Sequence, residues 1–122
     1  MITWDLKAVE QFFGLHAVQR ESSSPIGIEF VFEIPTPGGP VQFSVRPTLD
    51  HCQFYTEDQI EFLSAHVDCT RIMINDDAEE EGGQCLVLQG NAGHVCVTPG
   101  KPHFKLFFSM HGQDTTYLSG RG

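Results

Sequence analysis

The sequence predicts an α+β fold, in which one or two short helices cover one face of an antiparallel sheet of five to six strands. Three observations predict it: a helical pattern at the N-terminus, an alternating hairpin at 28 to 46, and several later apolar segments separated by turn residues. The alternative is an all-β sandwich, in which residues 53 to 67 form strand instead of helix.

The first helix is expected at about residues 4 to 13. Asp5 or Thr3 can cap its start, and Gly14 suits a cap at its end. Apolar residues recur between them at helical spacing, namely Leu6, Val9 and Phe13. The polar segment QRESSSPIG that follows is expected to be a loop.

The clearest local pattern is a hairpin. Alternate residues are apolar on both sides of the turn-like segment PTPGGP, namely Ile28, Phe30, Phe32 and Ile34 before it and Val41, Phe43 and Val45 after it. If Ile34 pairs with Val41, Glu29 falls opposite Arg46. We therefore predict one buried apolar face, and a weak exposed ion pair between Glu29 and Arg46 on the other face.

Residues 56 to 67, TEDQIEFLSAHV, fit two patterns. Thr56 with Gln59 forms a capping box, and three apolar residues share a helical face, namely Ile60, Leu63 and Val67. As a strand, the apolar pattern changes phase between Phe62 and Leu63. We predict a second helix here, preceded by a short strand at HCQFY.

Further strands are predicted at CTRIMI, CLVLQ, HVCVT and FKLFFSM. A chain of 122 residues is the size of a single domain, so we expect one compact domain over 1–111 and a frayed tail over 112–122. The chain has no signal-peptide pattern and no apolar segment of membrane-spanning length, which predicts a soluble cytoplasmic protein that does not enter a membrane.

The net charge of -9 is unevenly distributed. Ten acids lie between Asp50 and Glu81 against one base, Arg71, whereas six acids and six bases make up the rest. Such a balance disfavours nucleic acid as a partner, because no basic stripe is present to neutralise phosphates. We predict instead an acidic surface that docks a basic protein partner, formed by Glu57, Asp58, Glu61, Asp76, Asp77, Glu79, Glu80 and Glu81. The alternative is that 76 to 81 is only a solvated loop.

We expect no metal and no cofactor. The acidic run NDDAEEEGG does not match a calcium loop, and the four cysteines, read as reduced thiols, form no close metal-binding pair. The residues whose chemistry suits zinc are His66, Cys69, His94 and Cys96. His51 and Cys52 are neighbours in sequence, which sends their side chains to opposite faces of a strand and does not make a catalytic dyad.

Three hypotheses follow for function. The first is a non-catalytic acidic binding protein of the inhibitor, immunity or chaperone type, since no catalytic signature such as G-x-S-x-G or H-E-x-x-H occurs. The second is a small-ligand or metal-binding domain, or a small enzyme, with a pocket between helix and sheet lined by Phe and one or two histidines. The third is an oligomeric structural subunit that assembles through a sheet edge, because Phe107 and Val31 fall on nominally polar faces.

Overall fold

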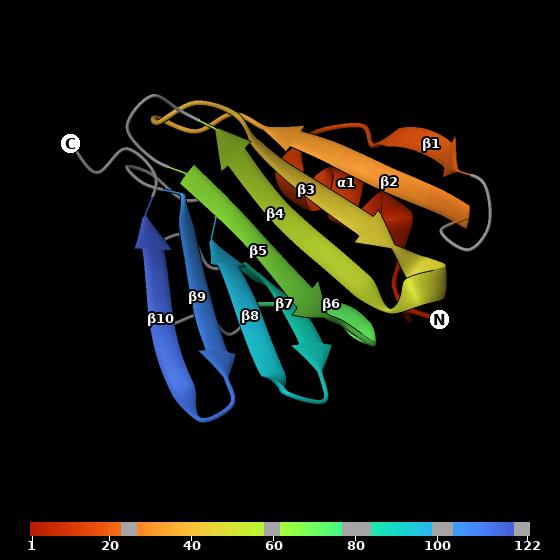
Figure 1. The fold of residues 1–122 in the computed structure, drawn as a ribbon. Coiled ribbons are helices and arrows are strands. Elements are labelled where there is room, and N and C mark those ends of the chain that lie inside the picture. The colour runs from red at the N-terminus through yellow and green to blue at the C-terminus, as the bar shows by residue number, and fades with distance from the viewer. Residues whose placement is uncertain (23–26, 58–61, 77–83, 99–103, 119–122) are drawn as a thin grey trace.

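The fold consists of two antiparallel sheets and one short helix (Figure 1). The computed structural model describes residues 1–22, 27–57, 62–76, 84–98 and 104–118. Each sheet has five strands in sequential order, β1-β2-β3-β4-β5 and β10-β9-β8-β7-β6. The first sheet consists of β1 (Val18–Ser22), β2 (Gly27–Ile34), β3 (Val41–Arg46), β4 (His51–Glu57) and β5 (Phe62–Asp68). The second consists of β6 (Arg71–Asn75), β7 (Cys85–Gly90), β8 (Gly93–Thr98), β9 (Lys105–Met110) and β10 (Gln113–Leu118).

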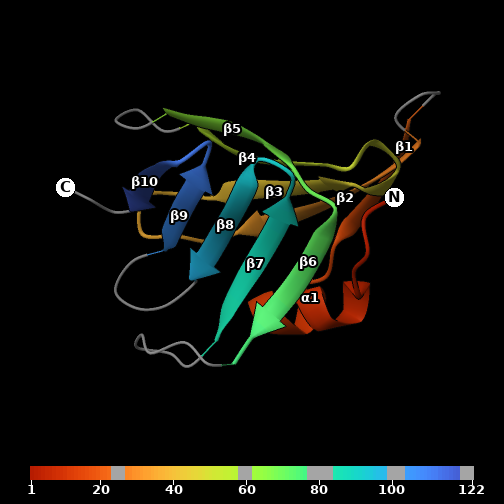
Figure 2. The ribbon, with the colours of Figure 1, turned by 90° about the horizontal axis from the view of Figure 1, so that it is seen from below.

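This arrangement supports the α+β prediction only in part. Antiparallel structure is present as predicted, but the strands are organised as two facing layers, and the described helical content is limited to α1 and the 3-10 turn Pro47–Leu49. The alternative prediction, an all-β sandwich, fits better. In Figure 2 the second sheet lies in front of β2, β3 and β4, so the two layers are seen one behind the other.

Helix α1 (Leu6–Phe13) forms where the apolar spacing predicted it. The Asp5 side chain caps its first turn by accepting a hydrogen bond from the amide of Ala8, and Gly14 ends it with a left-handed φ of 68°. Val9 is buried, and Phe13 lies 5.7 Å from the ring of Phe32. The helix is therefore attached to the core by its apolar face.

The predicted hairpin is confirmed in its register. Phe30 pairs with Val45, Phe32 with Phe43, and Ile34 with Val41. Its inner face forms the centre of the core, where the ring of Phe43 stacks at 5.8 Å from Phe32 and at 4.8 Å from Phe54 on β4. Phe32, Phe43 and Phe54 are fully buried.

The helix predicted for 56 to 67 is wrong over the described residues. Thr56 is the penultimate residue of β4, and its hydroxyl donates to the carbonyl of Pro40 at 3.0 Å instead of capping a helix. Residues 62 to 68 form β5, in which Val67 is buried between exposed His66 and Asp68. Pairing with β4 along seven residues outweighed a helical pattern that depended on a few apolar positions. Residues 58–61 lie outside the described residues.

Two segments predicted as irregular are strands. Val18–Ser22, which overlaps the predicted loop QRESSSPIG at residues 19 to 22, pairs with β2 as β1, and Gln113–Leu118, in the predicted tail, pairs with β9 as β10. Both are edge strands rich in polar residues, which a periodicity search misses because they bury little apolar surface. The other strands, β6 to β9, lie close to their predicted positions.

The inner face of the second sheet is apolar over β6 to β9. Leu86, Leu88, Val95, Val97 and Leu106 point inward and are completely buried. On its outer face, the strand register aligns three rows. The central row contains Met73, Val87, Cys96, Phe107 and Thr116. One flanking row contains Arg71, Gln89, His94, Ser109 and Asp114, and the other contains Asn75, Cys85, Thr98, Lys105 and Leu118.

The two sheets join where β5 passes into β6. The amide of Thr70 donates to the carbonyl of Gln89 at 2.8 Å, and that of Cys69 donates to Asp50 at 2.8 Å. Gly90 faces the backbone carbonyl of Asp68 so closely that a Cβ atom would overlap it. The N-terminal segment adds an isolated parallel bridge from Thr3 to Arg71. These contacts hold the end of β5 against β7 and the N-terminal segment against β6.

Candidate functional site

A polar network occupies the outer face of the first sheet. At its centre, Arg46 Nε donates to Glu29 Oε2 at 2.6 Å, Nη1 to His51 Nδ1 at 3.2 Å, and Nη2 lies 3.5 Å from Gln53 Oε1. The side chains of Arg46 and Glu29 are only 24% and 14% exposed. The predicted pairing of Glu29 with Arg46 is therefore present, but it is more buried than the exposed pair the sequence indicated.

The network extends to His66 on β5. His51 Nε2 lies 3.1 Å from His66 Nδ1. Because Arg46 can only donate, His51 must accept at Nδ1 and carry its proton at Nε2, which then donates to His66. Burial lowers the pKa of His51, and the nearby Arg46 and His66 act in the same direction, whereas Asp68 and Glu29 oppose it. The chain of hydrogen bonds thus holds His51 as a neutral donor.

This geometry disfavours a metal at the two histidines. A metal bound at His51 Nε2 would place the proton at Nδ1, where it would face the Arg46 guanidinium instead of an acceptor. No group of three or more His, Cys, Asp and Glu suited to a metal occurs among the residues that the structure describes. We therefore assign the network a structural role in holding four strands together, β2 to β5.

The candidate zinc ligands fall in three different places. His66 is exposed on the outer face of the first sheet, whereas Cys69 is buried beyond the end of β5. His94 and Cys96 lie on the outer face of β8, as their spacing predicted. His94 is near the ring of Phe107, at 6.5 Å between centroids. The structure therefore places His94 and Cys96 on one face, but it does not bring either residue together with His66 or Cys69.

The thiols of Cys52 and Cys69 are neighbours in the core. A hydrogen bond to Cys69 raises the pKa of the Cys52 thiol well above its ordinary value, and burial acts in the same direction. Cys69 also donates to the carbonyl of Arg71 at 3.4 Å. Both side chains are fully buried. Cys52 is therefore a poor nucleophile, and His51 on the opposite face of β4 cannot activate it.

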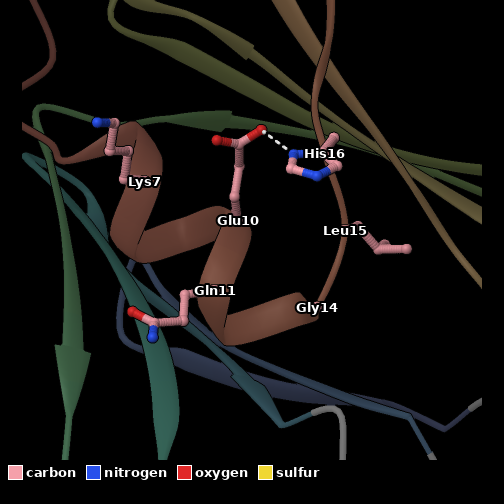
Figure 3. Close-up of a pocket in the computed structure, with 6 residues that line it drawn as sticks. All are labelled: Lys7, Glu10, Gln11, Gly14, Leu15 and His16. Atoms are coloured by element: carbon pink, nitrogen blue, oxygen red, sulfur yellow. Dashed lines mark ion pairs between the residues drawn. The ribbon is translucent and has the colours of Figure 1, made fainter.

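A shallow hollow lies beside α1, and Figure 3 shows its lining residues. Its volume is about 490 Å³, and it is lined by Lys7, Glu10, Gln11, Gly14, Leu15 and His16. Glu10 is engaged locally, because its Oε2 accepts from the amide of Ala17 at 2.9 Å and lies 3.4 Å from His16 Nδ1. His16 itself is 98% exposed. The bond from Ala17 to Glu10 thus holds the segment before β1 against the helix, and the open hollow encloses a ligand poorly.

The predicted acidic surface is described only at its margins. Glu57 ends β4, and the exposed Asp76 follows β6, where its Oδ1 accepts from the Gln84 side chain at 2.7 Å. The other six predicted residues, Asp58, Glu61, Asp77, Glu79, Glu80 and Glu81, lie outside the described residues. In sequence they fall between β4 and β5 and between β6 and β7. Asp50, an acid of the same charged stretch that was not predicted to belong to this surface, pairs with the N-terminal amine at 3.0 Å.

Comparisons of the chain with protein-family models, with curated proteins and with solved structures found no match. Within the described ranges, no helix has the length and apolar character needed to cross a bilayer. Function must therefore be inferred from the chemistry of the chain's own surfaces.

Proposed function

We propose that the protein is a non-catalytic binding protein that holds a basic protein partner with its acidic side chains. The observation that carries this proposal is the charge distribution: ten acids and one base lie between Asp50 and Glu81. Eight of these ten form the predicted surface, and they fall at or between the ends of strands, in the connections β4–β5 and β6–β7. Connections at sheet ends are common positions for binding residues.

The positions of the bases support the same conclusion. Arg46 is engaged by Glu29, while Arg71 is exposed on the outer face of the second sheet. Among the residues that the structure describes, Glu10, Glu29 and Asp50 form ion pairs, and Asp76 of the predicted surface accepts a hydrogen bond from the neutral side chain of Gln84. An acidic surface that keeps its charge can steer a basic protein toward it and orient it on contact.

The alternative, a ligand pocket between helix and sheet, is less well supported. Between α1 and the sheets, aromatic rings fill the side toward the first sheet, where Phe13 contacts both Phe32 and Phe43 at centroid distances of 5.7 and 6.0 Å. The side toward β6 holds a hollow of about 320 Å³, whose polar lining is limited to Gln11 and Gln84. The hollow beside α1 is open, and its carboxylate is engaged by the backbone. Neither place offers a set of convergent polar groups to a substrate.

Partner capture from a lysate at about 0.1 M and about 0.5 M salt tests the proposal, because salt screens the attraction between exposed charges. We expect a basic protein to be retained at low salt and released at high salt. The variant Glu79→Gln/Glu80→Gln/Glu81→Gln should retain much less of this basic protein at low salt.

A matched control separates local docking from net charge. Glu21→Gln/Glu33→Gln/Asp68→Asn also removes three negative charges, but from β1, β2 and β5. It should retain the partner. Equal losses in both triple variants, or a captured protein that is acidic and insensitive to salt, would overturn the proposed site.

A further inference from the structure

The central row on the outer face of the second sheet is apolar over four adjacent strands. Met73, Val87, Cys96 and Phe107 are direct cross-strand neighbours, from β6 to β9. They are partly exposed and stand apart from the residues that pack against the core, so the row belongs to the surface. A contiguous apolar row of this kind on a water-exposed sheet face is typical of an association surface.

The charges around this row differ from those of the whole chain. The three positions of the face with full charges are Arg71, Lys105 and Asp114, which sum to +1, while the chain carries -9. The strand positions of this face do not carry the acidic excess of the chain, so they present little charge that would repel a second copy. A basic partner, by contrast, gains no attraction here.

The strand register makes the face complementary to itself. A two-fold axis parallel to β8 would place β6 of one copy over β10 of the other, and β7 over β9. Arg71 and Asp114 occupy the two ends of one row, so each would face the other residue in the partner copy. In the central row, Phe107 would face Val87, and Cys96 would meet Cys96 near the axis.

The other in-plane axis, perpendicular to the strands, gives a poorer match. It would superpose each strand on its own copy and reverse the rows, which places Arg71 over Asn75 and Asp114 over Leu118. Neither contact pairs opposite charges. Only the axis along β8 buries the apolar row and matches the two charges at once.

We propose that the protein forms a symmetric dimer, in which the outer faces of the second sheets of two copies pack against each other about an axis along β8. The two sheets would lie about 10 Å apart, the usual spacing of packed sheets. The interface would be isologous and closed, so assembly ends at two chains. The dimer uses strand residues of β6 to β10, and none of its charged positions belongs to the predicted acidic set, so its tests do not depend on the proposed function.

Light scattering over a range of protein concentrations tests the proposal, with the monomer at 13.6 kDa as reference. We expect a dimer whose dissociation constant rises at least about thirty-fold in Phe107→Asp, since a central aromatic residue is a typical hot spot. The control is Val18→Asp, which alters a residue 57% exposed on β1. It should leave the dimer intact.

Charge reversal tests the axis without disturbing the core, because Arg71 and Asp114 are both exposed. Arg71→Asp or Asp114→Arg alone should weaken the dimer about tenfold, because each variant inverts two contacts in one dimer. The double variant Arg71→Asp/Asp114→Arg should restore it. Arg20→Asp, a charge reversal on β1, should have no effect.

Cross-linking gives a measurement that does not depend on mutant stability. A short bismaleimide, whose two arms each alkylate one thiol, should join two wild-type chains. Cys96→Ser should abolish this product, whereas Cys85→Ser should retain it, since Cys85 lies one strand away from the axis. A monomer at all concentrations, or a dimer that ignores both Phe107→Asp and the charge reversals, would overturn the proposal.

Discussion

On the outer face of the first sheet, charged and polar side chains are joined by hydrogen bonds. On the outer face of the second sheet, an apolar row lies between two rows that contain few charged residues. Both sheets have five antiparallel strands in sequential order, and both bury their inner faces in one core. On the first, Arg46 contacts three other side chains, from β2 and β4. On the second, Phe107 continues a row of apolar neighbours. Sheets of identical topology can therefore differ in what their outer faces do: one can link its own strands through side chains, and the other can present an apolar surface to a partner.

Among the variants that test this difference between the two faces, we expect the largest loss of stability from Arg46→Met. This change leaves Glu29, with 14% of its side chain exposed, without its cation, and it removes the donor to His51. We expect a loss of about 2 kcal/mol in the free energy of unfolding, because a largely buried carboxylate loses its partner. Arg71→Met on β6, which changes an exposed residue of the second sheet, should cost the monomer less than about 0.5 kcal/mol. Denaturant unfolding measures both, and similar losses would show that the two faces do not differ in cohesion.

We expect a smaller loss of stability from Phe107→Thr. This variant tests whether the apolar row of the second sheet contributes to the stability of the monomer. Phe107 is only partly buried and lies outside the core cluster, so its removal should change the unfolding free energy of the monomer by less than about 1 kcal/mol. The measurement is denaturant unfolding at a concentration low enough for the monomer to dominate. A loss as large as that of a buried Phe, about 3 to 5 kcal/mol, would place Phe107 in the core instead.

The smallest effect is expected in the pH dependence of the unfolding free energy, through His51. The pKa of His51 is lowered in the folded protein, so below the unfolded value of about 6.5 the unfolded chain binds more protons at this residue than the folded chain. Its contribution to stability therefore falls as the pH drops below about 6.5. Replacing it in His51→Gln should flatten the decline in unfolding free energy between about pH 7 and about pH 5.5.

The matched control for this prediction is His94→Gln on the second sheet, which lies outside the Arg46 network. It shows whether the flattening is specific to the Arg46 network. An equal flattening in both variants would mean that the decline does not arise from the network on the first sheet.

Local patterns determined several elements of this protein by themselves. Helix α1 formed where Asp5 and Gly14 could cap it, and the β2–β3 register followed from the alternation of apolar residues, because both depend on neighbours in sequence or across a short turn. The same register placed Glu29 opposite Arg46, which is one of the four contacts of the polar network. Residues of one hairpin can be paired from the sequence alone.

Tertiary structure decided the rest. The segment 62 to 68 became a strand because β4 offered a continuous partner, and the polar strands β1 and β10 formed by extending sheet edges that periodicity does not reveal. His66 reached His51, and the rows of the second outer face aligned, only through the registers of successive strands. The physical reason is that hydrogen bonding between strands and burial of a shared core depend on partners far along the chain, which no local pattern contains.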